Sequence, residues 1–372
     1  MSMSIGAEQA QLPPRRVEID GETFTISRAW PEKPSGGGGS AGTGVRLGVE
    51  AMSEAGSIRA GRFSDGVVDL FPPGTDPRLP RMAETVRRGE VISHRPRRRA
   101  VVRTVDPAGT VTFVKLVRPG KAQAILDGVA RAGAFEGPFR TPRVLAWDEA
   151  SVTLSGLSGV GLHESPLEEA QWIRAWQEVL QAWSESVSAP ADAASAGAAL
   201  AGDAQAGGDV PVHGAEQEIQ VLRRWYEQAA PFILRRERFH RAVEAAAGVM
   251  AELPPPQLRP AHRDFHDKQV LWSAKEGPAL LDVDTACLAD PALDLGNLRA
   301  HATWRHRQGV WTEPQAEVVR QAVDAAADRI GVRAEAVAAY ERASLLRLLC
   351  VYAFRPVYAD LAAEVREELG SL

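Results

Sequence analysis

Hydrophobic and polar residues alternate over short stretches in the first part of the chain, as they do in β-strands. Residues 45–49 read Val-Arg-Leu-Gly-Val, with an apolar side chain at every second position. Residues 57–63 and 67–71 predict two further strands. Asp76 is placed to cap a short helix that follows them. We therefore predict a β-rich cap over residues 44–92.

A second group of short elements follows over residues 93–160. Turn residues such as Asp106-Pro107-Ala108-Gly109 favour a tight hairpin. The predicted elements, in chain order, are strands at 99–105 and 110–117, a helix at 121–134, and strands at 142–147 and 151–154. This order predicts a small lobe of strands with one helix.

From residue 161 onward the hydrophobic pattern becomes helical. Tryptophans between residues 172 and 183 fall on one helical face, which indicates core packing. Residues 219–250 and the chain from residue 315 onward also have helical periodicity. The sequence therefore predicts an α+β fold with two lobes, of which the second, residues 161–372, is mainly helical.

Two stretches have few apolar residues that could pack. Residues 1–43 contain Pro13-Pro14 and a glycine-rich run near their end, so we expect a flexible segment in which only residues 22–26 form a strand. Residues 184–215 are rich in Ala, Gly and Asp, and they predict a flexible insertion in the helical lobe.

The composition narrows the possible functions. The 372 residues carry a net charge of −5, which argues against a nucleic-acid partner held by bulk positive charge. Only two cysteines, Cys287 and Cys350, are present, so a disulfide framework is not expected and a reducing cytoplasm is. No apolar run is long enough for a membrane span. We expect a cytoplasmic protein without a membrane or nucleic-acid partner.

Acidic residues gather around a predicted hairpin in the second lobe. The apolar segments 270–272 and 279–281 flank a turn that contains Gly277-Pro278. Because a hairpin folds back on itself, residues 262–269 come close to Asp282 and Asp284. Carboxylates that are gathered in this way repel one another unless a cation or a shared proton offsets the repulsion.

The residues before this hairpin have the spacing of a kinase catalytic loop. Residues 262–269 read His-Arg-Asp-Phe-His-Asp-Lys-Gln, which is H-R-D, four further residues and an amide. Asp282 then follows the hairpin, where a second metal ligand is needed. Phosphoryl transfer requires hard oxygen ligands for Mg²⁺ and a separate carboxylate for the acceptor hydroxyl.

Residues 260–297 resemble the aminoglycoside phosphotransferase and choline kinase-like family. That family carries His-x-Asp-x-x-x-x-Asn, then an apolar strand that ends in Ile-Asp, then Gly-Asp-Pro-x-x-Asp-Leu. This chain has His262, Asp264 and Gln269, then Leu281-Asp282, then Ala-Asp-Pro-Ala-Leu-Asp-Leu at residues 289–295. The resemblance implies a two-lobed, protein-kinase-like fold and transfer of phosphate from ATP.

The resemblance also implies roles for individual residues. Asp264 is expected to be the catalytic base, and Gln269 and Asp282 are expected to hold Mg²⁺. Lys115 is expected to reach the phosphates of ATP, and Leu157 to lie near the adenine between the lobes. The residues expected to support the loop are His262, Asp284, Asp290 and Asp294.

Two departures from the family pattern stand out. Gln269 replaces the usual Asn, and maltokinase-like sugar kinases resemble this chain in having Gln there and a cap before the small lobe. Kinases usually pair the lysine that corresponds to Lys115 with a Glu of the first helix. The helix at 121–134 contains no Glu, and Asp127 is our hypothesis for the partner.

Three hypotheses follow from the sequence. The first is an ATP- and Mg²⁺-dependent kinase that phosphorylates a small-molecule hydroxyl: a sugar, an amino sugar, an aminoglycoside or a related natural product. The second is a binding module with a degenerate kinase fold. The third is a metal-dependent hydrolase that uses His262, Asp264 and His266 as ligands. The sequence sets neither the acceptor nor the oligomeric state.

Overall fold

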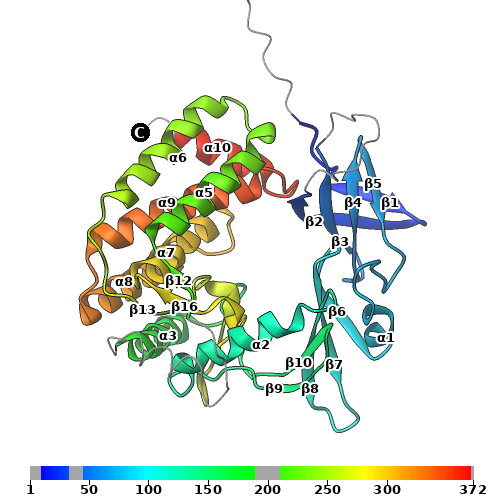
Figure 1. The fold of residues 1–372 in the computed structure, drawn as a ribbon, viewed down its shortest axis with the longest axis horizontal. Coiled ribbons are helices and arrows are strands. Elements are labelled where there is room, and N and C mark those ends of the chain that lie inside the picture. Colours follow the sequence, from blue (N-terminus) through cyan, green and yellow to red (C-terminus); the bar gives the residue numbers. More distant parts are fainter. Residues whose placement is uncertain (1–9, 33–44, 189–209, 370–372) are drawn as a thin grey trace, which may run out of the picture.

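The computed structural model describes residues 10–32, 45–188 and 210–369. Two strand-rich parts, the cap and the small lobe, lie on one side of the molecule, and a helical lobe lies on the other (Figure 1). The predicted α+β fold with a strand-rich N-terminal part and a helical C-terminal part is therefore confirmed.

The cap is an antiparallel sheet with the strand order β1-β2-β3-β4-β5. Its strands are β1 (Arg16–Ile19), β2 (Glu22–Pro31), β3 (Leu47–Ser53), β4 (Ile58–Ser64) and β5 (Val67–Leu70). Phe24, Ile26 and Val49 are fully buried in its core. Strands β1 and β2 correct the expectation that residues 1–43 are flexible except at 22–26. The remainder of that segment, 1–9 and 33–43, lies outside the described residues.

The small lobe, which we call the N-lobe, is a sheet with the order β6-β7-β8-β10-β9. Its strands are β6 (Gly89–Arg95), β7 (Arg99–Val105), β8 (Val111–Val117), β9 (Val144–Trp147) and β10 (Ser151–Ser155), and helix α2 spans Ala122–Arg131. The predicted hairpin and helix are confirmed, but β6 starts before residue 93.

The helix that we predicted after Asp76 is shorter and is not capped by that residue. Helix α1 spans only Met82–Val86. The Asp76 carboxylate instead accepts hydrogen bonds from the backbone N–H groups of Arg78 and Arg97 and lies 2.9 Å from His94 Nε2. Because His94 belongs to β6, this buried pair joins the end of the cap to the N-lobe.

The helical lobe, which we call the C-lobe, is built around a core of buried aromatic and aliphatic side chains. Its helices are α3 (Glu169–Val187), α5 (Ala215–Ala229), α6 (Arg236–Ala251), α7 (Ala292–Arg307), α8 (Glu313–Ile330), α9 (Ala334–Tyr352) and α10 (Ala359–Leu369). The helical pattern over 219–250 is therefore two helices. Pro231 and the left-handed Arg235 (φ 50°) separate them.

The expectation that residues 184–215 form a flexible insertion is wrong at both ends. Residues 184–187 are the last residues of α3, whose apolar face packs in the core, and strand β12 (Val212–His213) and the first residue of α5 occupy the other end. Residues 189–209 lie outside the described residues. No helix in the described part of the chain is long and apolar enough to cross a membrane.

Two small sheets in the C-lobe carry the segment that has the kinase-loop spacing. Strands β14 (Val270–Ser273) and β15 (Gly277–Leu280) form the predicted hairpin, and β11 (Val160–Gly161) pairs with β14. Strand β16 (Cys287–Ala289) pairs with β12 and with β13 (Arg259–Ala261). The chain between β13 and β14 is the candidate catalytic loop.

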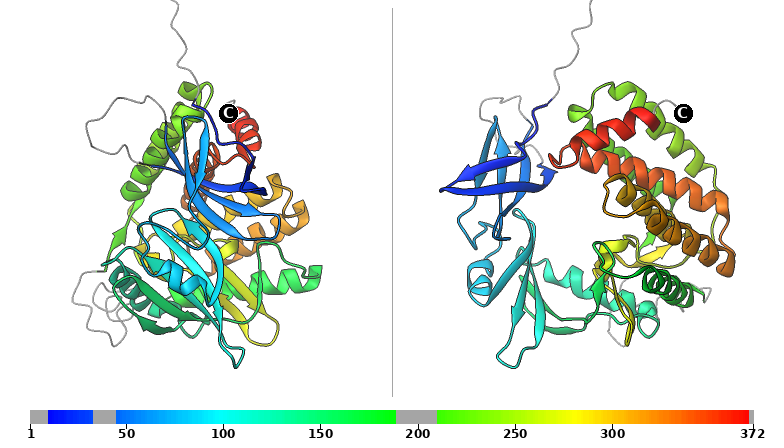
Figure 2. Two further views of the ribbon diagram at one scale, coloured as in Figure 1. Left: turned by 90° about the vertical axis from the view of Figure 1, so that its right-hand side faces the viewer. Right: turned by 180° about the vertical axis from the view of Figure 1, so that it is seen from behind.

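The cap also approaches the C-lobe. The backbone N–H of Ala10 donates to Pro231 O at 2.8 Å. The loop between α9 and α10 faces the cap sheet in Figure 1 and in the view from behind on the right of Figure 2. The cap therefore contacts both lobes.

Candidate active site

Helix α7 holds the start of the catalytic loop through one buried carboxylate. Asp294 Oδ2 accepts the backbone N–H of His262 at 2.8 Å, and Oδ1 accepts that of Arg263 at 2.7 Å. The indole N–H of Trp183 also donates to Oδ2. Since Asp294 is fully buried, these donors replace the water that the carboxylate has lost.

Asp290 and Asn297 anchor the neighbouring backbone. Asp290 Oδ1 accepts the N–H of Ala292 at 2.9 Å, at the first turn of α7. The Asn297 side chain donates to Phe265 O at 3.0 Å. Both ends of the short loop around Asp264 are therefore tied to α7.

His262 links the loop to the end of the β14–β15 hairpin. Its Nε2 lies 2.8 Å from Leu281 O, and its Nδ1 lies 3.3 Å from the backbone N of Asp264. Because Nε2 faces an acceptor and Nδ1 faces a donor, this geometry requires the neutral tautomer with the proton on Nε2. His262 therefore orients the backbone of Asp264 rather than offering a nitrogen to a ligand.

Asp264 presents a partly exposed carboxylate, with 44% of its side chain accessible. The partial loss of water around the carboxylate acts to raise its pKa. The nearby His266, Arg347 and His301 outweigh this effect and lower the pKa of Asp264. The nearest cation is His266, whose Nε2 lies 3.7 Å from Asp264 Oδ2. Asp264 is thus ionised at neutral pH and can accept a hydrogen bond from a hydroxyl group.

Lys115 reaches across from the N-lobe to two carboxylates of the C-lobe. Its Nζ lies 2.7 Å from Asp282 Oδ1 and 2.7 and 2.8 Å from the two oxygens of Asp284. Burial acts to lower the pKa of Lys115, but these carboxylates outweigh it and raise the pKa. The ammonium group is therefore firmly charged, and it lies beside the residue expected to hold Mg²⁺.

Gln269 lies beside Asp282 at one end of the hairpin. Its backbone carbonyl accepts the N–H of Leu281 at 2.8 Å, and Val270 pairs with Leu280. Asp282 itself has a left-handed backbone (φ 53°), which is an uncommon conformation for a residue with a side chain. An amide oxygen and a carboxylate are the hard donors that Mg²⁺ takes, so the residues present fit this ion.

A comparison with models of known protein families shows to which family the chain belongs. A model described as the phosphotransferase enzyme family (APH) matches residues 92–346, which is more than half of the chain. The chain belongs to the phosphotransferase enzyme family. It is a kinase, and the cap strands β1 to β5 lie outside the matched residues.

Solved structures share the fold of this phosphotransferase. A thermostable mutant of aminoglycoside phosphotransferase APH(4)-Ia is 13% identical, with 76% of this chain and 94% of that chain covered and a TM-score of 0.54. Choline kinase from Cryptosporidium parvum is 10% identical, with 79% and 92% covered and a TM-score of 0.52. No curated protein sequence matches the chain.

The structure does not bring Asp127 to Lys115. Asp127 lies on α2, where its Oδ1 accepts from Gln123 at 2.7 Å. The anions within 4.0 Å of Lys115 in the described chain are Asp282 and Asp284, so the hypothesis that Asp127 is its partner is wrong. Leu157 is half-buried between β10 and β11, in the chain that leads from the N-lobe to the C-lobe.

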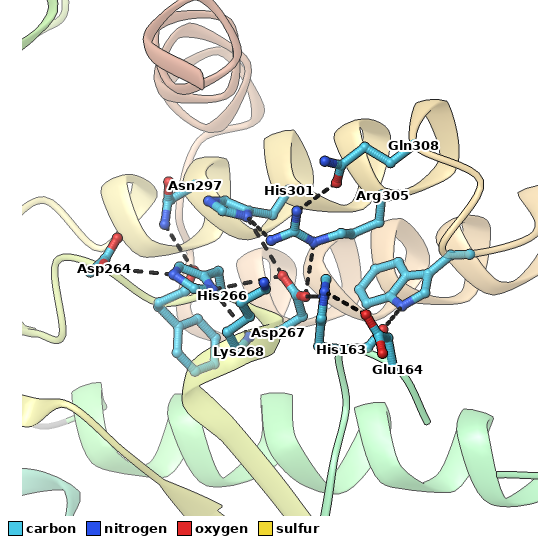
Figure 3. Close-up of polar contacts among 12 residues, drawn as sticks. His163, Glu164, Asp264, His266, Asp267, Lys268, Asn297, His301, Arg305 and Gln308 are labelled. Atoms are coloured by element: carbon cyan, nitrogen blue, oxygen red, sulfur yellow. Dashed lines mark hydrogen bonds and ion pairs between the residues drawn. The ribbon is translucent and has the colours of Figure 1, made fainter. Parts of the chain in front are cut away.

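A buried polar cluster behind Asp264 was missed in the sequence. Asp267 is fully buried, and its Oδ2 lies 2.9 Å from Arg305 Nε and 2.5 Å from His163 Nδ1. The rings of His266 and His301 stack at 4.2 Å. Figure 3 shows Asp267 between these groups, with Asp264 on the far side of His266. Only the position of Asp267 inside the kinase-like loop could have drawn attention to the cluster.

The pKa values of the two stacked histidines of this cluster are shifted in opposite directions. Burial acts to lower the pKa of His266, but the carboxylates of Asp264 and Asp267 raise it to about 9. Burial, followed by the charge of His266, lowers the pKa of His301 to about 3. His266 Nδ1 accepts the backbone N–H of Lys268 at 3.1 Å, so the ring carries its proton on Nε2, 3.7 Å from Asp264 Oδ2.

Among the described residues, the three ligands of the hydrolase hypothesis do not come together as a metal site. The three residues whose ligand atoms lie within 4.8 Å of one another are His266, Asp267 and His301, rather than His262, Asp264 and His266. A metal there would compete for Asp267 with the guanidinium of Arg305 and with His163, which lie 2.9 and 2.5 Å from its Oδ2. This set is better explained as an internal salt-bridge network.

Proposed function

We propose that this phosphotransferase moves the γ-phosphate of ATP to a hydroxyl group of a small molecule, with Mg²⁺ as cofactor. The observation that carries the proposal is the position of Lys115, whose ammonium group bridges Asp282 and Asp284 across the two lobes. Nucleotide phosphates need a fixed cation and metal-holding carboxylates at one place. Membership of the family supports the use of ATP.

In this proposal the acceptor hydroxyl approaches Asp264. The low pKa of Asp264 makes it a weak base in the ground state, so its main role is to orient the hydroxyl. It takes the proton late, as the oxygen bonds to phosphorus and becomes acidic. The loop contacts of Asp294 and His262 hold the carboxylate in place.

Lys115 would pair with phosphate oxygens of ATP once the nucleotide binds. Gln269 and Asp282 would hold Mg²⁺, which neutralises phosphate charge during the transfer. Asp284 would then keep Lys115 charged and aimed at the nucleotide, a role that a Glu of the first helix has in protein kinases. The ammonium group of Lys115 lies 2.7 Å from Asp284 Oδ1, which supports this role.

A screen of ATP consumption tests the proposed function. Wild-type protein is incubated with Mg·ATP and panels of sugars, sugar acids, amino sugars and aminoglycosides. We expect acceptor-dependent ATP consumption that falls at least about 100-fold in Asp264→Asn, because loss of a positioned base costs about 10² to 10⁴ in rate. Nucleotide affinity should stay within about twofold. Equal activity of Asp264→Asn and wild type would refute the assignment, and ATP binding without turnover on every panel would favour the degenerate binding module.

A further inference from the structure

A turn rich in arginine joins strands β6 and β7 of the N-lobe. Residues 95–99 read Arg-Pro-Arg-Arg-Arg, and we call them the arginine turn. In protein kinases the lysine lies on the third strand of the small lobe, and a glycine-rich loop covers the phosphates of ATP. Lys115 likewise lies on β8, the third strand of the N-lobe sheet, but the arginine turn contains no glycine.

The pairing of the strands puts two of these arginines on the same face of the sheet as Lys115. Arg95 pairs with Arg99, Arg99 pairs with Val117, and Val101 pairs with Lys115. Directly paired residues share a face, and side chains two positions apart along a strand do so as well. The side chains of Arg95 and Arg99 therefore lie in the row next to that of Lys115.

This face of the sheet is the one that meets the C-lobe. Lys115 reaches the C-lobe carboxylates from it. The opposite face buries Leu116 in one cluster with Met82 of α1, and α1 lies on the side of the sheet away from the C-lobe (Figure 1). Burial acts to raise the pKa of Asp282, but Lys115 and then Arg99 outweigh it and lower the pKa. This effect agrees with a position of Arg99 close to the metal-holding carboxylate.

The arginine turn has like charges that face each other without an anion between them. Arg95 and Arg99 lie directly opposite across β6 and β7, an arrangement that destabilises a sheet. Burial, followed by the charge of Arg99, lowers the pKa of Arg95 to about 10. Across residues 10–32, 45–188 and 210–369, no carboxylate oxygen lies within 4.0 Å of the guanidinium of Arg95, Arg98 or Arg99. An anion bound here would offset the repulsion.

The backbone of the arginine turn has its own hydrogen bonds. The N–H of Arg97 donates to Asp76 Oδ2 at 2.7 Å, and that of Arg98 donates to Arg95 O at 3.1 Å. Arg97 also has a left-handed backbone (φ 59°). A glycine-rich loop holds phosphate with free backbone N–H groups. Because these two N–H groups already have acceptors, the guanidinium groups are the donors that the turn offers to an anion.

The cap holds the arginine turn in place. The guanidinium carbon of Arg95 lies 5.4 Å from the centre of the Trp30 ring of β2. A Cβ atom at Gly48 of β3 would lie 2.7 Å from Pro96 Cγ, so the absence of a side chain lets the cap sheet meet the turn closely. These contacts fix the turn from the side opposite to the nucleotide.

The order of residues along β8 indicates which part of a nucleotide Arg99 meets. Thr112 pairs with Ser155, the last residue of β10 before the chain that leads to the C-lobe. Lys115 follows along β8, and then Val117, the partner of Arg99. At about 3.4 Å per residue, the row of Arg99 lies about 7 Å beyond that of Lys115. With the adenine at the connection between the lobes, the terminal phosphates extend toward Arg99.

We propose that Arg99, with Arg95 beside it, binds the β- and γ-phosphates of ATP in place of a glycine-rich loop. The inference rests on the proposed function and adds two residues to its nucleotide site. A guanidinium group matches two phosphate oxygens with two parallel N–H groups. The bound phosphates bring the negative charge that the pair of arginines lacks.

Nucleotide binding without an acceptor tests the arginine turn. Calorimetry with the full chain would compare Mg·ATP, Mg·ADP and AMP, which differ in their terminal phosphates. We expect Arg99→Ala to weaken ATP binding about tenfold or more and to leave AMP binding within about twofold. Arg99→Lys keeps the charge and should recover part of the loss. The matched control is Arg87→Ala, an exposed substitution just after α1, which should bind ATP as wild type does. Unchanged ATP affinity in Arg99→Ala, or an equal loss for AMP, would overturn the proposal.

Thermal unfolding without nucleotide separates a binding role from a structural one. Because Arg95 and Arg99 repel each other, Arg99→Ala should unfold at the same temperature as wild type or at a higher one. An unfolding temperature below that of wild type would show that Arg99 stabilises the free protein, and it would overturn the argument from repulsion.

Kinetics separate this proposal from the proposed function. With an acceptor that wild type uses, Arg99→Ala should lower kcat/KM for ATP about tenfold and leave the KM for the acceptor unchanged. Unchanged kinetics would overturn the role of Arg99 while the kinase function would stand. ATP binding that depends on Arg99, without transfer to any acceptor, would refute only the proposed function. Wild type that binds no ATP would refute both.

Discussion

At the scale of single residues, Lys115 of the N-lobe joins the C-lobe through the carboxylates of Asp282 and Asp284. The spacing of Asp264, Gln269 and Asp282 follows the chain and a local hairpin, so it could be predicted. The pair of Lys115 with Asp284 joins residues that are 169 positions apart. Such a contact depends on how the lobes pack, and no local pattern encodes it.

The phenol of Tyr352 is expected to ionise at an unusually low pH. Burial acts to raise the pKa of its phenol, but Arg355, Arg305 and Lys268 outweigh it and lower the pKa to about 7. We therefore expect the difference in phenolate absorbance between wild type and Tyr352→Phe to rise near pH 7. A rise at the ordinary value for tyrosine, about pH 10, would show that these three cations do not lower the pKa of Tyr352.

The lowered pKa of Tyr352 also makes the free energy of unfolding depend on pH. Because the folded-state pKa of Tyr352 lies below the unfolded value, ionisation stabilises the folded chain. This contribution is complete above about pH 10, declines as the pH falls, and is lost below about pH 7. The stability difference between wild type and Tyr352→Phe should therefore grow as the pH rises from 7 to 10, as measured by chemical denaturation.

At the scale of elements, helix α2 packs on the turn at residues 283–285 through a glycine. A Cβ atom at Gly128 would lie 2.4 Å from Asp284 O and 2.5 Å from its Cα. The absence of a side chain thus allows the helix to approach the residue that pairs with Lys115. The helical pattern at 121–134 predicted α2, but a glycine inside a helix carries no sign of its partner.

Gly128→Ala tests this close approach. We expect it to destabilise the fold by about 1–3 kcal/mol, as overpacking does, and to lower kcat by moving Asp284 away from Lys115. Thermal or chemical unfolding and ATP turnover would measure both effects. Gly248→Ala in α6 is the matched control, since nothing lies within 4 Å of a Cβ there. It should stabilise by about 0.5–1 kcal/mol, and equal behaviour of the two variants would contradict the packing argument.

At the scale of the whole molecule, the two-lobed fold was predicted and the place of the cap was not. Alternation of apolar residues predicted strands β3 to β5 and, at residues 22–26, half of β2, but the rest of β2 and the whole of β1 lie in a stretch that reads as flexible. Contacts such as Ala10 to Pro231 link residues 221 positions apart along the sequence. A cap that touches both lobes is therefore a product of tertiary packing.

We propose that Lys115, Asp264, Gln269 and Asp282 form one phosphoryl-transfer site. Tracing labelled γ-phosphate from ATP in the presence of Mg²⁺ and an acceptor tests this most directly. We predict that the label moves to an acceptor oxygen, that chelation of Mg²⁺ stops the transfer, and that Asp264→Asn abolishes it while ATP still binds. Label that is found only in inorganic phosphate, or transfer that survives both Asp264→Asn and chelation, would contradict the account.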